Sequence, residues 1–304
     1  MFTVLTQMAV LIACGALWQV LAPKHIPATA HRRALTDLVF YILLPALVLN
    51  VIWNTTLDFS SYKISLLALS GLATGALSMW LILRVVTTSP TQKGALMLAA
   101  TFPNVTYLGL PVLDKMLGSW SNAIVVQYDL FACTPVLMTA GMLLAHYYGN
   151  AEHQVHPLKE LLKVPPLWAV CLALILNLTG TPQPEILHSA LSMLSGGVVP
   201  LMLIALGMSI RWDSLHMRYL PLLIPVAAVT LFLVPTEVFF MTHLLHLPQQ
   251  INHVAVLSAA MPTMVFGIVI CERYKLDSAL YAAAVTLTTL CCVLTLPLWF
   301  HWIT

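Results

Sequence analysis

Two prolines interrupt apolar segments that are otherwise long enough to form helices. Pro103 is followed by Asn104 and Thr106, and Pro262 is followed by Thr263. Because proline removes a backbone hydrogen bond and clashes with the preceding turn, such a break deep in a membrane needs protein or water to satisfy the backbone. A helix N-terminus freed by a break carries a partial positive charge, and Asn and Thr add hydrogen-bond donors. We therefore predict an anion site formed by these five residues; the alternative is a pair of plain proline kinks.

Two acidic residues lie inside apolar segments, Asp129 in one and Glu237 in another. A charged carboxylate near the bilayer centre costs roughly 3 kcal/mol or more, so such residues normally face protein or water and have a role. We predict that Asp129, Glu237 or both couple proton movement to the function of the site. For Asp129 the alternative is a hydrogen-bonded structural carboxyl. Sodium coupling is less favoured, because no acid lies near the break at Pro262.

Three further features concern packing, cavities and metals. Asn50 follows Pro45 in an apolar segment, where it either lines a substrate cavity or makes a helix–helix hydrogen bond. Gly71 and Gly75 form a small-xxx-small pattern, which indicates close helix packing. The chain has no His-Glu-x-x-His and no Cys-x-x-Cys element, so we predict no metal site and no cofactor.

The composition places these residues in a membrane. Of 304 residues, 60% are hydrophobic and only 8% are charged, whereas soluble domains carry about 25% charged residues. The net charge of +2 gives no indication of a nucleic-acid partner, because the basic residues are scattered between apolar segments, and we expect none. A span needs about 20 apolar residues, and the sequence predicts an all-α protein with ten transmembrane helices, at 2–22, 35–54, 64–86, 94–116, 121–147, 161–179, 186–210, 219–245, 251–271 and 278–302.

Lysine and arginine residues set the predicted orientation, because cytoplasmic connections are enriched in them. The even-numbered connections hold only Lys63 and Lys115. We therefore expect the odd-numbered connections in the cytoplasm and both termini on the non-cytoplasmic side, in a bacterial inner membrane. The odd-numbered connections hold Lys24, Arg32, Arg33, Arg84, Lys93, Lys159, Lys163, Arg211, Arg218, Arg273 and Lys275.

The two halves of the chain match each other. Pro45 precedes Asp58 by the same distance as Pro200 precedes Asp213. Each half would contain five spans, and because five is odd the second half enters the membrane from the opposite side. The sequence thus predicts a 5+5 inverted repeat, typical of secondary transporters, with repeats at 1–150 and 151–304 joined by a polar linker from Tyr148 to about Lys159. Further prolines in matching order are Pro103 with Pro262 and Pro135 with Pro297.

Nearly the whole chain resembles the auxin efflux carrier family, including its bacterial malonate or malate permeases. The motifs that carry the resemblance lie at 43–47 (LLPAL), 103–111 (PNVTYLGLP), 200–207 (PLMLIALG), 260–263 (AMPT), 272–274 (ERY) and 295–298 (TLPL).

This resemblance implies a fold like that of bile-acid:sodium symporters. Broken helices 4 and 9 would cross, helices 1, 2, 6 and 7 would form a scaffold that dimerises, and helices 3–5 and 8–10 would form a transport domain that moves like an elevator. It also implies that Gln127 lies near the substrate, because it matches a glutamine of plant relatives.

We therefore expect a secondary transporter rather than an enzyme. Its partners would be the lipid bilayer, a small carboxylate such as malonate, malate or an auxin-like aromatic acid, and a proton as co-substrate. An intramembrane aspartyl protease needs a second Gly-x-Gly-Asp element beside Tyr128-Asp129, and ATP drive needs a P-loop; the sequence has neither. A membrane sensor or scaffold with a transporter fold, and a sodium-coupled symporter, stay open as alternatives.

Overall fold

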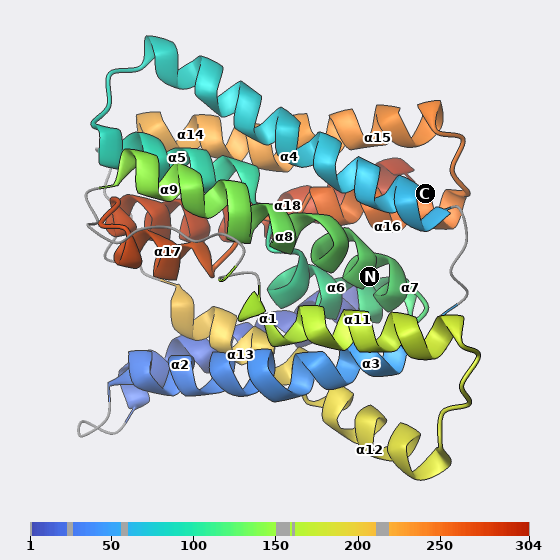
Figure 1. Ribbon diagram of the computed structural model, residues 1–304. Coiled ribbons are helices and arrows are strands. Elements are labelled where there is room, and N and C mark those ends of the chain that lie inside the picture. The colour runs from blue at the N-terminus through green and yellow to red at the C-terminus, as the bar shows by residue number, and fades with distance from the viewer. Residues whose placement is uncertain are drawn as a thin grey trace. The chain divides into compact units, whose positions relative to one another are not determined.

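A computed structural model describes residues 2–22, 27–55, 60–149, 159, 162–210 and 219–303 of the chain (Figure 1). Within these ranges all regular secondary structure is helical, which confirms the predicted all-α class. The isolated β-bridge there joins Pro103 and Thr263. Several features used above lie outside the described residues, namely Lys24, Asp58, linker residues 150–158, Arg211, Asp213 and Arg218.

Six helices of the described residues are long and apolar enough to cross a membrane. Two further apolar helices are shorter, Ala9–Leu21 and Pro165–Leu178. The predicted fourth and ninth spans are each interrupted at their proline. The protein is thus an integral membrane protein, and the ten-span inverted repeat stays a prediction. The six candidate spans are Ala30–Trp53, Ser61–Val85, Ser121–Tyr148, Glu185–Ser209, Leu220–Leu244 and Ser278–Ile303.

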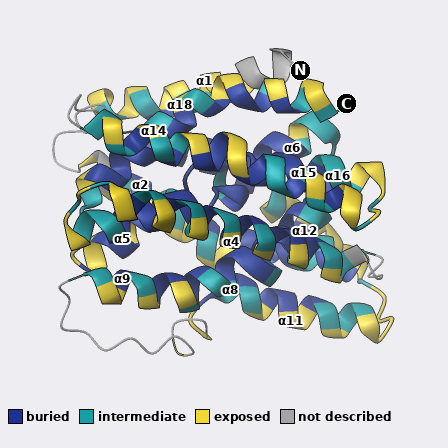
Figure 2. Cartoon of the chain, turned by 90° about the horizontal axis from the view of Figure 1, so that it is seen from above, coloured by how far each residue is buried: buried dark blue, intermediate teal, exposed yellow. Residues whose placement is uncertain are grey.

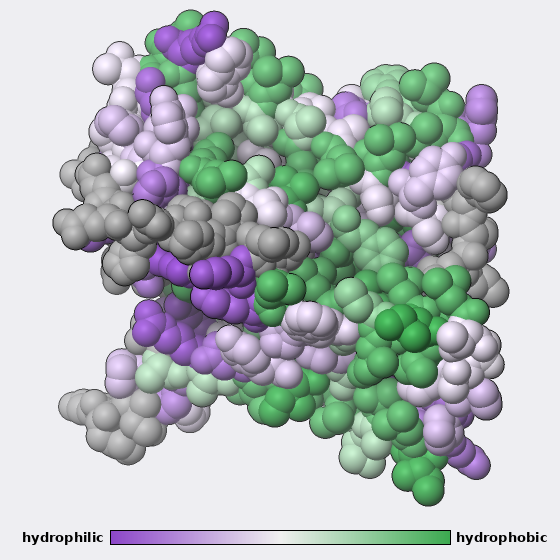
Figure 3. Space-filling view, in the orientation of Figure 1, coloured by the Kyte–Doolittle hydropathy of each residue, from purple (hydrophilic) through white to green (hydrophobic). Residues whose placement is uncertain are grey.

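Large apolar side chains lie on the outside of these helices. Ile186 is 88% exposed and Met193 80% exposed, both on helix α12 (Glu185–Gly196). Figure 2 shows exposed residues recurring along α4 (Ser60–Val85) and α11 (Pro165–Leu178), and in Figure 3 hydrophobic residues cover much of the face shown. Such surfaces are unfavourable in water and suit contact with lipid.

Contacts along the chain form two compact units. Unit 1 comprises Met1–Asp58, Thr106–Val126 and Lys159–Ser209. In it α1 (Phe2–Leu21) packs against α13 (Val198–Ser209), while α3 (Leu44–Trp53) packs against α11 and α12. The first pair is close because glycines remove side-chain bulk: a Cβ at Gly15 would overlap the backbone of Ile204, and one at Gly207 that of Ile12. The remaining helices of unit 1 are α2 (Ala28–Leu38), α6 (Leu110–Leu117) and the start of α7 (Ser121–Tyr128).

Unit 2 comprises Phe59–Val105, Gln127–Leu158 and Ile210–Thr304. Its helix α4 packs against α5 (Pro90–Thr101) and α15 (Val234–Leu244), and α18 (Ser278–Ile303) packs against α5 and α14 (Leu220–Ala228). Trp299 of α18 donates a hydrogen bond of 2.7 Å to the carbonyl oxygen of Leu231. The other helices are α8 (Thr134–Val136), α9 (Met142–Tyr148), α16 (Gln249–Ala259) and α17 (Gly267–Arg273).

Short π-helical segments recur in front of prolines. The segments η1 (Val39–Leu43), η2 (Val105–Gly109), η3 (Asp129–Cys133) and η7 (Val229–Leu233) each end two residues before a proline. Because proline cannot donate to the carbonyl four residues back and its ring clashes there, a wider turn relieves the clash without ending the helix. A fifth segment, η4 (Leu137–Gly141), follows Pro135 instead. The prolines concerned are Pro45, Pro111, Pro135 and Pro235.

Candidate functional site

The two predicted helix breaks meet in unit 2. Helix α5 ends at Thr101 and α16 at Ala259, and after each the chain is non-helical for a few residues. The N–H of Asn104 donates to the carbonyl oxygen of Pro262 (2.7 Å), and the N–H of Met264 donates to that of Phe102 (3.0 Å). The two segments therefore run antiparallel, and each supplies hydrogen bonds that the other lost at its break.

Two side chains of helix α18 form hydrogen bonds with backbone groups of the second break. The N–H of Thr263 donates to Oγ1 of Thr288 (3.1 Å), and the hydroxyl of Tyr281 donates to the carbonyl oxygen of Met264 (2.8 Å). The hydroxyl of Thr263 donates to the carbonyl oxygen of Ala99 (2.9 Å). The sequence did not single out Thr288 and Tyr281. What could have indicated them is that they are polar residues in an otherwise apolar span.

Replacing Thr288 with valine is expected to lower the free energy of unfolding by about 1–3 kcal/mol, because the buried N–H of Thr263 then loses its acceptor. Thr230→Val is the matched control, since the Thr230 hydroxyl donates only to Val226 in its own helix. Thermal unfolding in detergent measures both variants. Equal stability of the two would show that Thr288 does not support the crossing.

Asn104 is a polar side chain without a partner at the crossing, and the Ser258 hydroxyl, four residues before Pro262, is another. Asn104 is fully buried, and neither its amide nitrogen nor its amide oxygen has a hydrogen-bond partner among the described residues. The amide oxygen of Gln127, in α7, is likewise buried and unpartnered. A buried polar group without a partner costs about 1–3 kcal/mol. A solute that both accepts and donates hydrogen bonds could satisfy Asn104.

The two intramembrane acids lie near Tyr128 in unit 2. Asp129 is buried and accepts a hydrogen bond of 3.2 Å from the Thr134 hydroxyl, while Ser70 donates to Glu237 at 3.5 Å. Tyr128 directly precedes Asp129 in the chain, and Val238, which directly follows Glu237, has a methyl group 3.2 Å from a Cβ built on Gly71 of α4. A Cβ built on Gly71 would lie 3.3 Å from the Tyr128 hydroxyl, so that hydroxyl is placed against α4. The structure thus brings the two predicted coupling residues into one neighbourhood.

The other predicted residues, Asn50 and Thr106, belong to unit 1. Asn50 donates to the Ser192 hydroxyl (3.2 Å), which is the helix–helix hydrogen bond considered from the sequence, and it also lines a cavity of about 540 Å³. Thr106 is buried in η2. For both residues a place at the substrate site stays a prediction.

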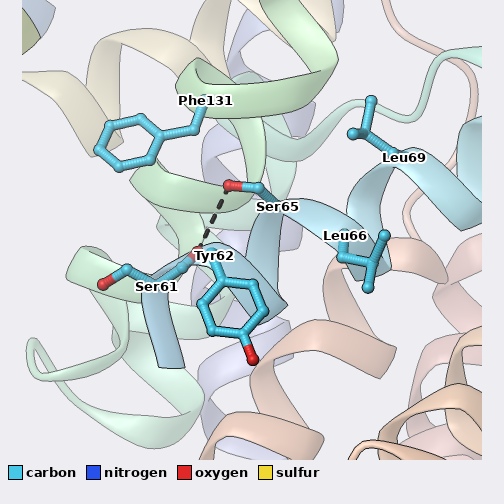
Figure 4. A pocket seen from close by; sticks show the side chains of 6 residues that line it. All are labelled: Ser61, Tyr62, Ser65, Leu66, Leu69 and Phe131. Atoms are coloured by element: carbon cyan, nitrogen blue, oxygen red, sulfur yellow. Dashed lines mark hydrogen bonds between the residues drawn. The ribbon is translucent and has the colours of Figure 1, made fainter. Parts of the chain in front are cut away.

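A further pocket lies on α4 in unit 2, with a volume of about 460 Å³ (Figure 4). Its wall is mostly apolar and includes Leu66, Leu69 and Phe131, and the Ser65 hydroxyl donates to the carbonyl oxygen of Ser61 (3.4 Å). No residue predicted for the site lines it, and its lining holds no charged side chain. It therefore does not suit an anion.

Known proteins are similar in sequence to most of this chain. The family described as membrane transport protein matches residues 1–300. An uncharacterized transporter of Methanothermobacter thermautotrophicus is 28% identical over 95% of this chain and 94% of its own length. One of Methanocaldococcus jannaschii is 27% identical over 88% and 89%, and one of Escherichia coli strain K12 is 25% identical over 67% and 66%. The chain belongs to the membrane transport protein family, which is the auxin efflux carrier family expected from the sequence, and it is a transporter rather than an enzyme.

Proposed function

We propose that the protein is a secondary transporter that binds a small carboxylate at the crossing of the two broken helices. The observation that carries this proposal is the wholly buried amide of Asn104, whose two hydrogen-bonding atoms have no partner among the described residues. The amide nitrogen can donate to a carboxylate oxygen, and charge-assisted hydrogen bonds of this kind are stronger than neutral ones. Malonate, malate and auxin-like aromatic acids are the candidate substrates.

The proposed mechanism is of the elevator type, in a ten-helix inverted repeat of the inner membrane with both termini non-cytoplasmic. One part of the protein carries the site across while a dimeric scaffold stays fixed. Two observations support it: the contacts fall into two compact units, and the crossing lies wholly within unit 2. Unit 2 would be the part that moves.

Uptake into proteoliposomes tests the proposed function. Labelled malonate, malate and indole-3-acetate would be offered with a proton gradient, a sodium gradient or no gradient. Saturable uptake of at least one acid is expected, with stimulation by the proton gradient. Stimulation by sodium alone would favour the symporter alternative. Binding without any flux would favour a sensor with a transporter fold.

Asp129→Asn is expected to make uptake insensitive to a pH gradient, because asparagine keeps the size of the side chain but cannot exchange a proton. The control is Thr134→Val, which removes the hydrogen bond from the Thr134 hydroxyl to Asp129 and leaves the carboxyl in place. Initial uptake rates at several external pH values measure both variants. An unchanged pH response in Asp129→Asn would exclude this residue as the coupling group, and Glu237→Gln would then be the variant to test.

A further inference from the structure

Unit 1 contains a cavity whose lining shares no residue with the crossing segments 102–104 and 262–264. Its volume of about 540 Å³ is in the range of small-molecule sites. All of its lining residues belong to unit 1, from helices α1, α3, α6, α7, α12 and α13 and the α6–α7 turn. The polar part of the lining consists of Asn50, Asp114, Lys115, Ser119, Asn122, Ser192 and Ser195.

The contacts of Asn122 show which atom of its amide is the oxygen, and this oxygen has no hydrogen-bond partner among the described residues. Asn122 contacts Oδ1 of Asp114 at 2.8 Å. Because an ionised carboxylate only accepts hydrogen bonds, the amide must present its nitrogen to Asp114. The oxygen of the Asn122 amide is therefore the other atom; it is buried and has no hydrogen-bond partner among the described residues. This oxygen can accept a hydrogen bond from a ligand.

The same lining holds one cation. Lys115 makes no ion pair or hydrogen bond with any described residue, although Asp114 precedes it in the chain. Its ammonium group can therefore take up a carboxylate from solution, and three N–H donors suit that partner. Across the lining, the Ser192 hydroxyl already accepts a hydrogen bond from Asn50 and can still donate one.

We propose that this cavity is a second binding site, for a small carboxylate that carries a hydrogen-bond donor next to its carboxylate group. Lys115 binds the carboxylate, and the amide oxygen of Asn122 accepts from a hydroxyl or an ammonium group at the neighbouring carbon. The proposal rests on the proposed function in that both sites take carboxylates. It narrows the substrate class, because a plain dicarboxylate leaves the Asn122 oxygen unpaired, and such a mismatch lowers affinity.

Three four-carbon dicarboxylates test the recognition directly in the purified, unmodified protein. Malate, aspartate and succinate share the two carboxylates and differ at one carbon, which bears a hydroxyl, an ammonium or only hydrogen. Calorimetric titration is expected to show malate or aspartate binding at least about 5-fold more tightly than succinate, the factor for roughly one net hydrogen bond. Succinate binding as tightly as both others would overturn the proposal.

Two variants assign the effect to the cavity. Lys115→Gln is expected to weaken binding of the preferred acid about 10-fold or more, as loss of a charge-assisted contact does. Lys63→Gln is the matched control, since it removes the same charge from unit 2, where Lys63 donates to the carbonyl oxygen of Leu245. Equal affinities of the two variants would overturn the proposal. Asn122→Ala should abolish the preference over succinate; if it does not fold, Ser192→Ala should weaken binding in its place.

An Asn104→Leu background separates this proposal from the crossing site. If the preference over succinate persists in Asn104→Leu and disappears in Lys115→Gln, the cavity binds in its own right, whatever happens at the crossing. If the preference disappears in Asn104→Leu and persists in Lys115→Gln, the crossing alone distinguishes the ligand from succinate, and the cavity proposal is wrong.

Discussion

Asn104→Leu is expected to unfold at a higher temperature than the wild type and to lose carboxylate binding about 100-fold. The Asn104 side chain is expected to lower the stability of the ligand-free protein and to raise its affinity for a carboxylate. Without a ligand, the buried amide has no partner, so an apolar side chain of similar size removes a cost of about 1–3 kcal/mol. With a ligand, the amide nitrogen would donate up to two hydrogen bonds to a carboxylate, each contributing about 1.5–3 kcal/mol.

The two readouts together distinguish a binding role from a structural one. Thermal unfolding in the absence of ligand gives the stability, and titration with malonate, malate and indole-3-acetate gives the affinity. Thr295→Val is the matched control, because the Thr295 hydroxyl is also buried without a partner among the described residues but lies about two helical turns beyond Thr288, the α18 residue that contacts Thr263. It should gain stability and keep binding. If the Asn104→Leu variant is less stable than the wild type and keeps its affinity for the acids, the proposal of a binding site at the crossing is contradicted.

The breaks themselves could be predicted because proline acts on its own helix. Pro103 and Pro262 interrupt their spans where the sequence indicates, and the predicted ends of several uninterrupted spans agree with the structure to within a few residues, as at 278–302 against Ser278–Ile303. Apolar length and proline are local properties, so a single sequence reveals them.

The partners at the crossing could not be predicted in the same way. Which carbonyl accepts from Asn104, and which hydroxyl accepts from the N–H of Thr263, depends on residues far apart in the chain. Thr288 was one of several threonines in an apolar span, and nothing local distinguishes it. In the unit 1 cavity the sequence indicated only Asn50. Asn122 could not be singled out, because its role depends on its contact with the Asp114 carboxylate.

For the glycine pattern of α4, the sequence predicts that packing is close, and the structure shows which atoms are packed there. The sequence indicated close packing at Gly71 and Gly75 but could not say against what. In the structure a Cβ on Gly75 would lie 2.5 Å from the carbonyl oxygen of Ala100 and 3.2 Å from the Cα of Thr101. A Cβ on Gly71 would meet only side-chain atoms, the nearest of them a Val238 methyl group at 3.2 Å. One glycine therefore faces backbone just before the break, and the other faces side chains that can move.

Gly75→Ala is accordingly expected to destabilise the protein by about 1–3 kcal/mol, the usual cost of overpacking, and to abolish uptake. The added methyl group must push the last turn of α5 away, and that turn carries the Ala99 carbonyl that accepts from Thr263 and leads directly into Pro103. Gly71→Ala, one helical turn earlier, should be neutral or stabilising, because alanine favours the helix by up to about 1 kcal/mol over glycine and its neighbours can adjust. Thermal unfolding and proteoliposome uptake measure both variants. If Gly75→Ala transports as well as Gly71→Ala, the position of α5 against α4 does not determine the geometry of the crossing.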